Sequence, residues 1–161
     1  MTCLINDIIT TVISGIVLTL ILFLFKEYLL PKKNITGEWK TKLKIKESSF
    51  NPFINLGIEF KIHLLQNGNE IIGSGEKIKD INQDGSETVF ERKKRVKIEI
   101  SGYYEKKYLR RSKVYFNVIE NGTERESRST YVITVRNKKH LKGTFTSTAG
   151  DSVGTVEMVK L

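Results

Sequence analysis

The chain has 161 residues, and its 27 lysines and arginines outnumber its 18 aspartates and glutamates, which gives a formal net charge of +9. This excess favours anionic partners, namely nucleotides, nucleic acid or the acidic inner leaflet of a membrane, without choosing among them. The single cysteine, Cys3, excludes a disulfide framework within the chain and is typical of a protein in a reducing compartment.

Residues 1–30 are predicted to contain one transmembrane helix. Residues 8–25 carry no charge, and as a helix they would be about 27 Å long, close to the ~30 Å hydrocarbon core of a bilayer. The alternative is a cleaved secretory signal, which needs a basic N-terminal region and a small-x-small cleavage site. No lysine or arginine precedes the apolar run and no such site follows Phe25, so we expect the segment to remain as an anchor.

The charges that flank this helix predict its orientation. Lys26, Lys32 and Lys33 follow the apolar run, whereas only Asp7 and the terminal amine precede it. The positive-inside rule therefore places the C-terminal domain in the cytoplasm, on a single-pass protein of the inner (plasma) membrane. Residues 31–34 are expected to form a short, stiff joint between the helix and that domain.

Small residues recur along one face of the predicted helix. Thr11, Gly15 and Thr19 are four residues apart, a spacing that lets two helix backbones approach closely in lipid. This stripe favours a homo-oligomer held together by transmembrane helix packing. The alternative is that threonine and glycine are merely tolerated within a membrane helix.

From residue 35 onward the sequence alternates between apolar and polar residues with a period of two, which is typical of strands with one buried face. Turn signals separate the runs at 66–69, 82–85, 120–122 and 149–151. Gly73 and Gly75 indicate a bulge or a sharp coil in the third strand. The expected strands are 39–46, 54–64, 70–78, 88–90, 96–104, 113–119, 129–136, 141–147 and 153–159.

Residues 31–161 are enough for one compact domain and too few for two, and the barrel is expected within residues 35–161. Strands joined mainly by tight turns predict an all-β fold, a small antiparallel up-and-down β-barrel of about eight strands, of the lipocalin-like kind. An open sandwich is the alternative. A transmembrane barrel is disfavoured because lysines occupy the face that would have to contact lipid.

Short motifs in this region resemble two known families. Residues 35–39, Ile-Thr-Gly-Glu-Trp, are similar to the Gly-x-Trp opening of lipocalin-like barrels. Residues 140–147 and 154–158 resemble the closing strands of the membrane-anchored β-barrel effectors of CBASS antiphage defence, and the strands around 114–117 and 129–131 fall where that family would have them. That family typically has two transmembrane helices, whereas this sequence predicts one.

The resemblance implies a function. It implies a membrane effector of bacterial antiphage defence whose cytoplasmic barrel binds a cyclic di- or oligonucleotide made by a partner cyclase. Binding would control the assembly of the transmembrane helices and the disruption of the inner membrane, with the ligand either activating or restraining the effector.

A receptor for such a ligand needs cations for phosphate, aromatic rings for stacking and small polar groups for the base edges. Residues 103–111 mix these types at a strand end, where a barrel mouth is expected. The alternative is that the tyrosines are packing residues and the charges belong to solvated turns. Trp39 is interpreted as a structural plug at the base of the barrel. The candidate ligand-binding residues are Tyr104, Arg110, Tyr115, Asn117, Arg128 and Thr130.

The sequence offers no nucleophile or metal site. His63 and His140 are far apart, and no Gly-x-Ser-x-Gly motif or phosphate-binding loop is present, so we expect a non-enzyme with no cofactor and no metal. The basic clusters 92–95 and 136–139 are interpreted as solvated hairpin tips. Two other functions stay open: a membrane-tethered lipocalin-like carrier of a small apolar ligand, and a binder of nucleic acid or lipid headgroups. A nucleic acid polymer is not the expected partner.

Overall fold

The computed structural model describes residues 2–25, 33–91, 95–107, 110–122 and 125–161. The chain divides into two compact units, residues 1–32 and residues 33–161. Lys26, residues 31–32 of the predicted joint and residues 92–94 of the first basic cluster lie outside the described residues.

The first unit contains a single helix, α1 (Thr2–Leu24). Its segment Ile5–Leu24 has a mean hydropathy of 2.3 and is long and apolar enough to cross a membrane. The hydroxyl of Thr11 donates a hydrogen bond to the carbonyl oxygen of Asp7, and that of Thr19 donates one to Gly15, both at 2.8 Å. The helix itself therefore satisfies both hydroxyls of the predicted stripe, and association through the stripe stays a prediction.

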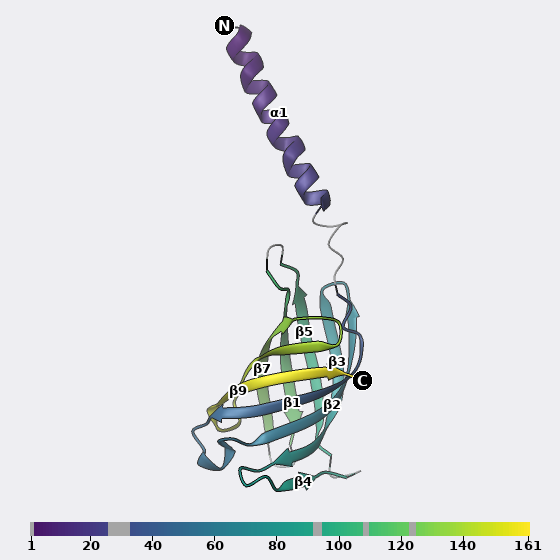
Figure 1. The fold of residues 1–161 in the computed structure, drawn as a ribbon, viewed down its shortest axis with the longest axis vertical. Coiled ribbons are helices and arrows are strands. Elements are labelled where there is room, and N and C mark those ends of the chain that lie inside the picture. Colours follow the sequence, from purple (N-terminus) through teal and green to yellow (C-terminus); the bar gives the residue numbers. More distant parts are fainter. Residues whose placement is uncertain (1, 26–32, 92–94, 108–109, 123–124) are drawn as a thin grey trace. The chain divides into compact units, whose positions relative to one another are not determined.

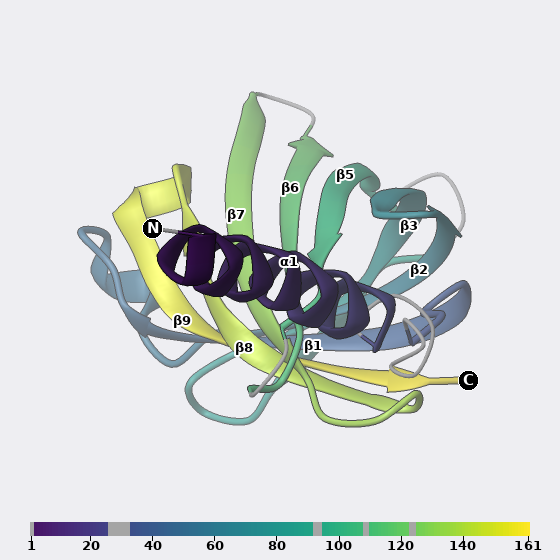
Figure 2. The ribbon, with the colours of Figure 1, turned by 90° about the horizontal axis from the view of Figure 1, so that it is seen from above.

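The second unit is a closed antiparallel β-barrel, as the alternation predicted. Eight strands follow one another around the wall in chain order, and pairing of β2 with β3 on one side and of β1 with β9 on the other closes the ring. Figure 1 shows β9 beside β1, and Figure 2 shows β7, β6, β5 and β3 side by side. The strands are β1 (Gly37–Glu47), β2 (Gly57–Asn67), β3 (Glu70–Ile81), β4 (Glu87–Val89), β5 (Lys97–Glu105), β6 (Lys113–Asn121), β7 (Glu126–Val135), β8 (His140–Ser147) and β9 (Ser152–Lys160).

Two strands differ from expectation. The short β4 pairs only with the last residues of β3 and is not part of the wall. The prediction that the second strand begins at residue 54 was wrong, because residues 51–53 form a short 3-10 helix, η2, and Asn55 has a positive φ of 64°. The backbone N–H of Asn55 donates to the carbonyl oxygen of Ile45, which closes this loop before β2 begins at Gly57.

The expected irregularity in β3 is present but displaced. Pairing continues without a break through Gly73 and Gly75, and the register shifts where Glu59 faces Lys79 while Phe60 faces Lys77. This pairing leaves one extra residue in β3, which is the signature of a β-bulge. Gly73 instead permits close strand approach, because a Cβ there would lie 2.5 Å from the carbonyl oxygen of His63. Gly73 and Gly75 therefore do not mark the bulge, and they lie where the backbones of β2 and β3 approach closely.

One end of the barrel is filled by side chains. Trp39 is fully buried there, and its indole N–H donates a 2.8 Å hydrogen bond to the carbonyl oxygen of Ile35. The β2–β3 turn lies at the same end, because the backbone N–H of Ile35 donates to Gln66 Oε1 and that of Tyr104 donates to Asn69. The plug interpretation of Trp39 agrees with this position. We call this the plugged end.

Barrel closure at β8 depends on Gly143. A Cβ at this position would lie 2.7 Å from the Cα of Ile133 and would overlap the carbonyl oxygen of Val132 on the neighbouring strand. We predict that Gly143→Ala lowers the free energy of unfolding by about 2–3 kcal/mol, because the wall has to move outward to accept the methyl group. Thermal unfolding of the full-length protein in detergent, followed by the emission of the only tryptophan, Trp39, measures the change.

Thr144→Ala is the matched control for this substitution, since Thr144 is the next residue and is exposed on the outer face. It should change stability by no more than about 0.5 kcal/mol. Equal stability of the Gly143→Ala variant and the wild type would show that the strand spacing at β8 is not limiting.

Candidate ligand-binding cavity

A cavity of about 220 Å³ occupies the barrel interior at the end opposite the plug. Part of its wall is apolar and comes from β1, from the loop that contains η2, and from the start of β2. The rest is polar and comes mainly from β3, β6 and β7. The lining residues are Leu43, Ile45, Phe53, Leu56, Ile58, Lys77, Asp80, Val118, Glu120, Gly122, Arg125, Ser127, Ser129, Tyr131, Phe145, Ser147, Ala149 and Ser152.

Three charged side chains meet on the polar wall. The ammonium of Lys77 lies 2.8 Å from Asp80 Oδ2 and 3.9 Å from Glu120 Oε1, and the three side chains are only 13%, 18% and 26% exposed. The β3 bulge explains why Lys77 and Asp80, three residues apart, line the same cavity, since an extra residue reverses the alternation between them. Their positions therefore follow from sheet register.

One oxygen of this cluster has no partner. Asp80 Oδ1 is buried and has no hydrogen-bond partner among the residues that the structure describes. A buried acceptor without a donor costs free energy, and that cost falls when a donor is supplied. The polar wall thus presents an acceptor that a ligand N–H or O–H group can satisfy.

Burial shifts the proton affinities of these groups. It raises the pKa of Asp80, and the nearby Lys77 ammonium only partly offsets this effect. Burial likewise raises the pKa of Glu120, the Asp80 carboxylate adds to the shift, and Lys77 again opposes it. Burial also raises the pKa of Tyr131, so its hydroxyl keeps its proton and remains a donor at neutral pH.

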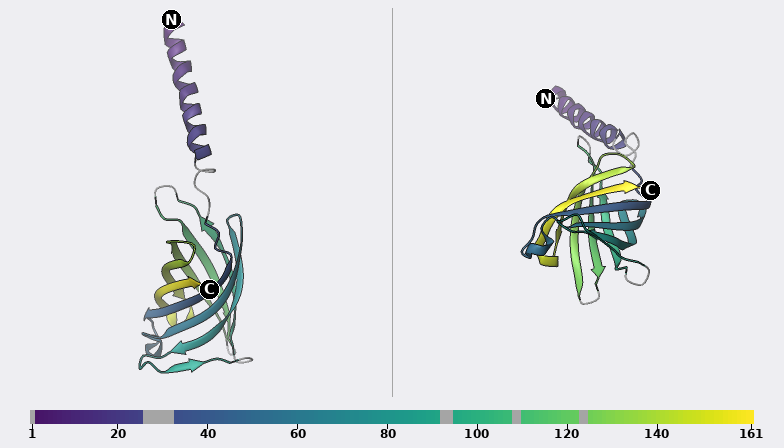
Figure 3. Two further views of the ribbon diagram at one scale, coloured as in Figure 1. Left: turned by 45° about the vertical axis from the view of Figure 1, so that its right-hand side comes forward. Right: turned by 60° about the horizontal axis from the view of Figure 1, so that its bottom comes forward.

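Two loops border the cavity and are tied together. The hydroxyl of Ser48 donates a 2.7 Å hydrogen bond to the carbonyl oxygen of Gly150, and the hydroxyl of Ser152 donates to Ala149 at 2.6 Å. Figure 3 shows η2 beside η4 (Ala149–Asp151), the short helix between β8 and β9. A Cβ on Gly150 would lie 2.9 Å from Phe53 Cδ2, so glycine lets the two loops close together. These bonds hold the border of the cavity in one arrangement.

The six candidate residues from the sequence lie elsewhere. Tyr104 is buried at the plugged end, and Arg110 is exposed in the β5–β6 loop at that same end. Asn117 and Thr130 are brought together on the outer face, 3.5 Å apart, and Arg128 is 72% exposed beside Glu126.

The sixth, Tyr115, stacks on Tyr103 with ring centroids 4.8 Å apart and donates a hydrogen bond to Glu105. None of the six is among the described residues that line the cavity. The end at which the sequence places a mouth is the end that Trp39 and Tyr104 fill.

Part of the cavity lining could be predicted from the alternation of inward and outward residues in the sequence. In β6 the inward residues Val114, Phe116 and Val118 lead by alternation to Glu120. In β7 the alternation from Tyr131 leads back to the two inward serines at 129 and 127. Lys77 and Asp80 could not be predicted in this way, because the bulge between them is not marked by glycine or proline.

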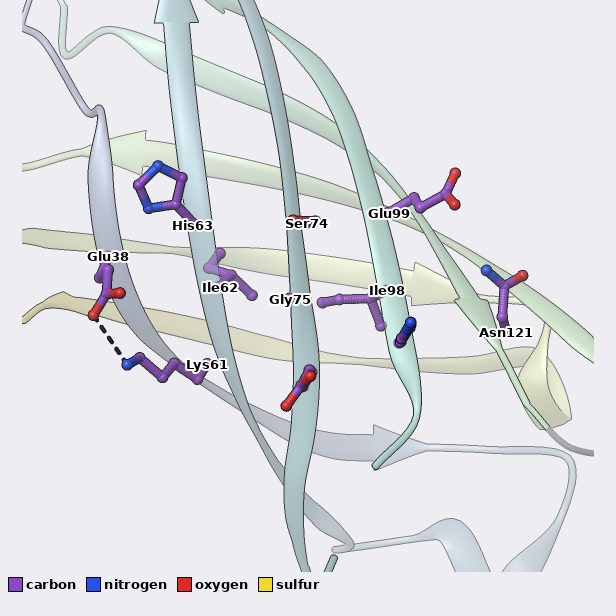
Figure 4. A pocket seen from close by; sticks show the side chains of 11 residues that line it. Glu38, Lys61, Ile62, His63, Ser74, Gly75, Ile98, Glu99 and Asn121 are labelled. Carbon is purple, nitrogen blue, oxygen red and sulfur yellow. Dashed lines mark ion pairs between the residues drawn. The ribbon is translucent and has the colours of Figure 1, made fainter. Parts of the chain in front are cut away.

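A larger hollow of about 500 Å³ lies on the outside of the wall, over Gly75 (Figure 4). Its side chains are spread over neighbouring strands, and Glu38 there forms a 3.0 Å ion pair with Lys61. Within the described residues, no group of three or more His, Cys, Asp or Glu side chains is placed to hold a metal ion. The internal cavity is therefore the stronger candidate, because it combines enclosure with converging polar groups.

Comparisons with known proteins agree on the fold alone. No family model and no curated protein matches the chain. A redesigned β-barrel, b11L5F_LGL, is 10% identical with a TM-score of 0.51, over 79% of this chain and 91% of that one. The redesigned β-barrel mFAP1, bound to DFHBI, is also 10% identical, with a TM-score of 0.50, over 79% of this chain and 94% of that one. The likeness shows that the second unit of this chain has the fold of a small closed β-barrel.

The raised pKa of Asp80 predicts an unusual pH dependence of stability. The folded protein holds this proton more tightly than the unfolded chain, so stability is lost as the pH rises from the unfolded value of about 3.8 through the raised folded pKa. We predict that Asp80→Asn removes this loss, so that the stability of the variant relative to wild type increases with pH. Thermal unfolding of full-length protein from pH 4 to pH 8 tests this trend.

Asp84→Asn is the control of opposite sign. Hydrogen bonds from Ser86 lower the pKa of Asp84, so its contribution is present above the unfolded pKa and disappears as the pH falls through the folded pKa. The stability of this variant relative to wild type should therefore decrease as the pH rises toward about 3.8 and change little above it, so this control is measured from pH 2 to pH 5. The same trend in both variants would contradict the assignment for Asp80.

Proposed function

We propose that the protein is a membrane-anchored receptor in which α1 spans the inner membrane and the barrel binds a small polar ligand in its internal cavity. The observation that carries this proposal is the polar wall, with Lys77, Asp80 and Glu120 drawn together and one carboxylate oxygen unpartnered. Charged groups are costly inside a barrel and add nothing to the binding of an apolar ligand. A polar ligand that binds these charged groups would explain why they are present inside the barrel.

The chemistry of the cavity suits a cyclic di- or oligonucleotide. The apolar wall around Leu43 and Phe53 offers a surface for a flat ring, Asp80 and Glu120 accept N–H groups from a base edge, and Arg125 offers a cation for phosphate. A volume of about 220 Å³ corresponds to roughly seven water molecules, so one base enters and the remainder lies at the mouth. A similar barrel bound to DFHBI supports the view that this fold accommodates a small ligand.

The resemblance of the sequence to CBASS effectors is the basis for proposing a cellular role. As an effector of antiphage defence, the protein would receive a cyclic nucleotide from a partner cyclase, and the ligand would control helix assembly and disruption of the inner membrane. The second candidate function, a tethered carrier of a small apolar ligand, is favoured by the apolar half of the cavity wall, which includes Ile45, Leu56 and Ile58.

Two arginines three residues apart provide a matched test of the ligand site. Arg125 lines the cavity, whereas Arg128 lies on the outer face and pairs with Glu126. We predict that Arg125→Ala weakens binding of a cyclic dinucleotide about ten- to a hundredfold, as expected for one charge-assisted phosphate contact. Arg128→Ala should leave the affinity unchanged. Calorimetry on the full-length protein in nanodiscs, with a panel of cyclic di- and oligonucleotides, measures both.

Any other pattern of affinities would contradict the proposed ligand site. Loss of affinity only in Arg128→Ala would support the outer-face residues nominated from the sequence, and equal loss in both would indicate a diffuse electrostatic surface. If no cyclic nucleotide binds to the folded protein and an apolar ligand is recovered by organic extraction, the carrier function replaces the receptor.

The proposed orientation has its own test. The barrel ends at Leu161, which is 66% exposed, so a fused reporter has room to fold. We predict that a reporter active only in the cytoplasm is active when fused after Leu161, because the lysines follow the apolar run. Alkaline phosphatase at the same position, which needs the periplasm, should be inactive. Its activity would reverse the orientation.

A further inference from the structure

The positive charge of the barrel is concentrated at the plugged end. Residues 105–113 contribute five lysines and arginines, and residues 136–139 contribute three. Lys33 and Lys160 add two more at the points where the chain enters and leaves the barrel. The acidic side chains in the same region are Glu38, Glu70 and Glu105. Cations therefore exceed carboxylates by a wide margin at this end.

Hydrogen bonds join these segments into one rim. The ammonium of Lys33 donates to the carbonyl oxygen of Arg136 at 3.0 Å, and the backbone N–H of Lys160 donates to Lys139 at 3.0 Å. The backbone N–H of Val135 donates to Ser112, which links the loop after β5 to the end of β7. We call the described parts of residues 33–38, 66–70, 105–113, 136–140 and 160–161 the basic rim.

Lysines on the outer wall and cations on the rim differ in their ion pairing. On the wall, Lys40 and Lys42 both pair with Glu59, at 2.9 and 3.1 Å, and Lys142 pairs with Glu157 at 2.7 Å. On the rim, residues 136–139 and 110–111 are exposed to solvent. These three wall lysines thus belong to cross-strand ion pairs. On the rim, Lys107 pairs with Glu105 at 3.4 Å and Lys160 donates to the carbonyl oxygen of Thr36, but the cations of 110–111 and 136–139 are exposed and outnumber the acidic groups near them.

Apolar and aromatic side chains stand exposed beside the rim. Leu65 and Ile72 face each other across β2 and β3 and are 49% and 61% exposed. Tyr103, which is 52% exposed, lies opposite Glu70 of the rim and stacks on Tyr115. Cations, tyrosines and aliphatic side chains together are the composition of surfaces that contact the headgroup region of a bilayer.

We propose that the basic rim binds anionic phospholipid headgroups and holds the barrel against the membrane surface. This inference rests on the anchoring part of the proposed function. Only eight residue steps separate Phe25 from Lys33, which span at most about 28 Å of extended chain. If α1 spans the bilayer, the chain enters the barrel at the basic rim and keeps that rim close to the leaflet whose charge complements it.

The opposite end of the barrel then remains open to the cytoplasm. The cavity bordered by η2 and η4 lies at that end, so headgroup binding and ligand binding use separate surfaces. The interpretation of residues 136–139 as a solvated hairpin tip is the alternative, and it predicts no contact with lipid.

The test uses the full chain with Cys3→Ser and one new cysteine carrying an environment-sensitive fluorophore. Asn67→Cys places the label on the rim, and Ser49→Cys places it in the loop at the cavity end. Nanodiscs contain either phosphatidylcholine alone or a mixture with 30% phosphatidylglycerol, each with spin-labelled lipid as quencher. We expect quenching at position 67 to be at least twofold stronger in the anionic discs and to fall in 1 M salt. Quenching at position 49 should be unchanged.

Charge reversal separates the rim from general electrostatics. Lys138→Glu with Lys139→Glu should abolish the lipid-dependent quenching, whereas the same change at Lys44 and Lys46, on the outer face of β1, should preserve it. Trp39 emission verifies that each variant is folded. Equal quenching in both kinds of disc, or equal loss in both double variants, would overturn the proposal.

One further outcome would identify another ligand for the rim, and a second would contradict the membrane anchor. If millimolar inorganic phosphate or an oligonucleotide releases the rim while the disc stays bound, the rim is a site for soluble anions and the headgroup proposal is wrong. Failure of the protein to enter discs at all would instead contradict anchoring by α1, and with it that part of the proposed function.

Discussion

Closure of the sheet is the constraint on which the rest of the structure depends. Pairing of β2 with β3 and of β1 with β9 leaves no open edge among the eight wall strands, and it gives each side chain of these strands an inner or an outer position. The curvature this requires is made possible by residues without a Cβ, such as Gly143, where a neighbouring carbonyl approaches the backbone. Whether a wall side chain points into the interior is then decided by its parity along the strand, and the bulge in β3 reverses that parity between Lys77 and Asp80.

The two ends of the barrel differ in how they use that enclosed space. At one end Trp39 and Tyr104 fill the interior with apolar volume that stabilises the wall. At the other, Lys77, Asp80 and Glu120 occupy the interior without filling it, and their burial is costly to the folded state. Tight apolar packing and buried charge thus lie at opposite ends of one wall.

The uncharged apolar run was enough to predict the N-terminal helix, and alternation between apolar and polar residues was enough to predict the strands and the closed up-and-down order. Each of these features depends on a local sequence pattern. The cavity was harder to predict. Glu120 and Ser129 continue the inward positions of β6 and β7, so their place inside the barrel could be predicted from alternation. Residue types common in nucleotide sites instead favoured Asn117 and Thr130, which lie on the outer face. The position of Asp80 depends on a bulge set by pairing with β2, which no local pattern marks.

The hydrogen bonds where the chain enters and leaves the barrel have a mechanical consequence. The chain enters along β1, which is paired on both sides, and the last residue, Leu161, donates its backbone N–H to Glu38 at the start of that strand. A pull on residue 33 directed along β1 would load the bonds to β2 and β9 together, in shear, and would not open them one at a time. The barrel is therefore built to bear tension at its point of attachment without being unravelled from that end.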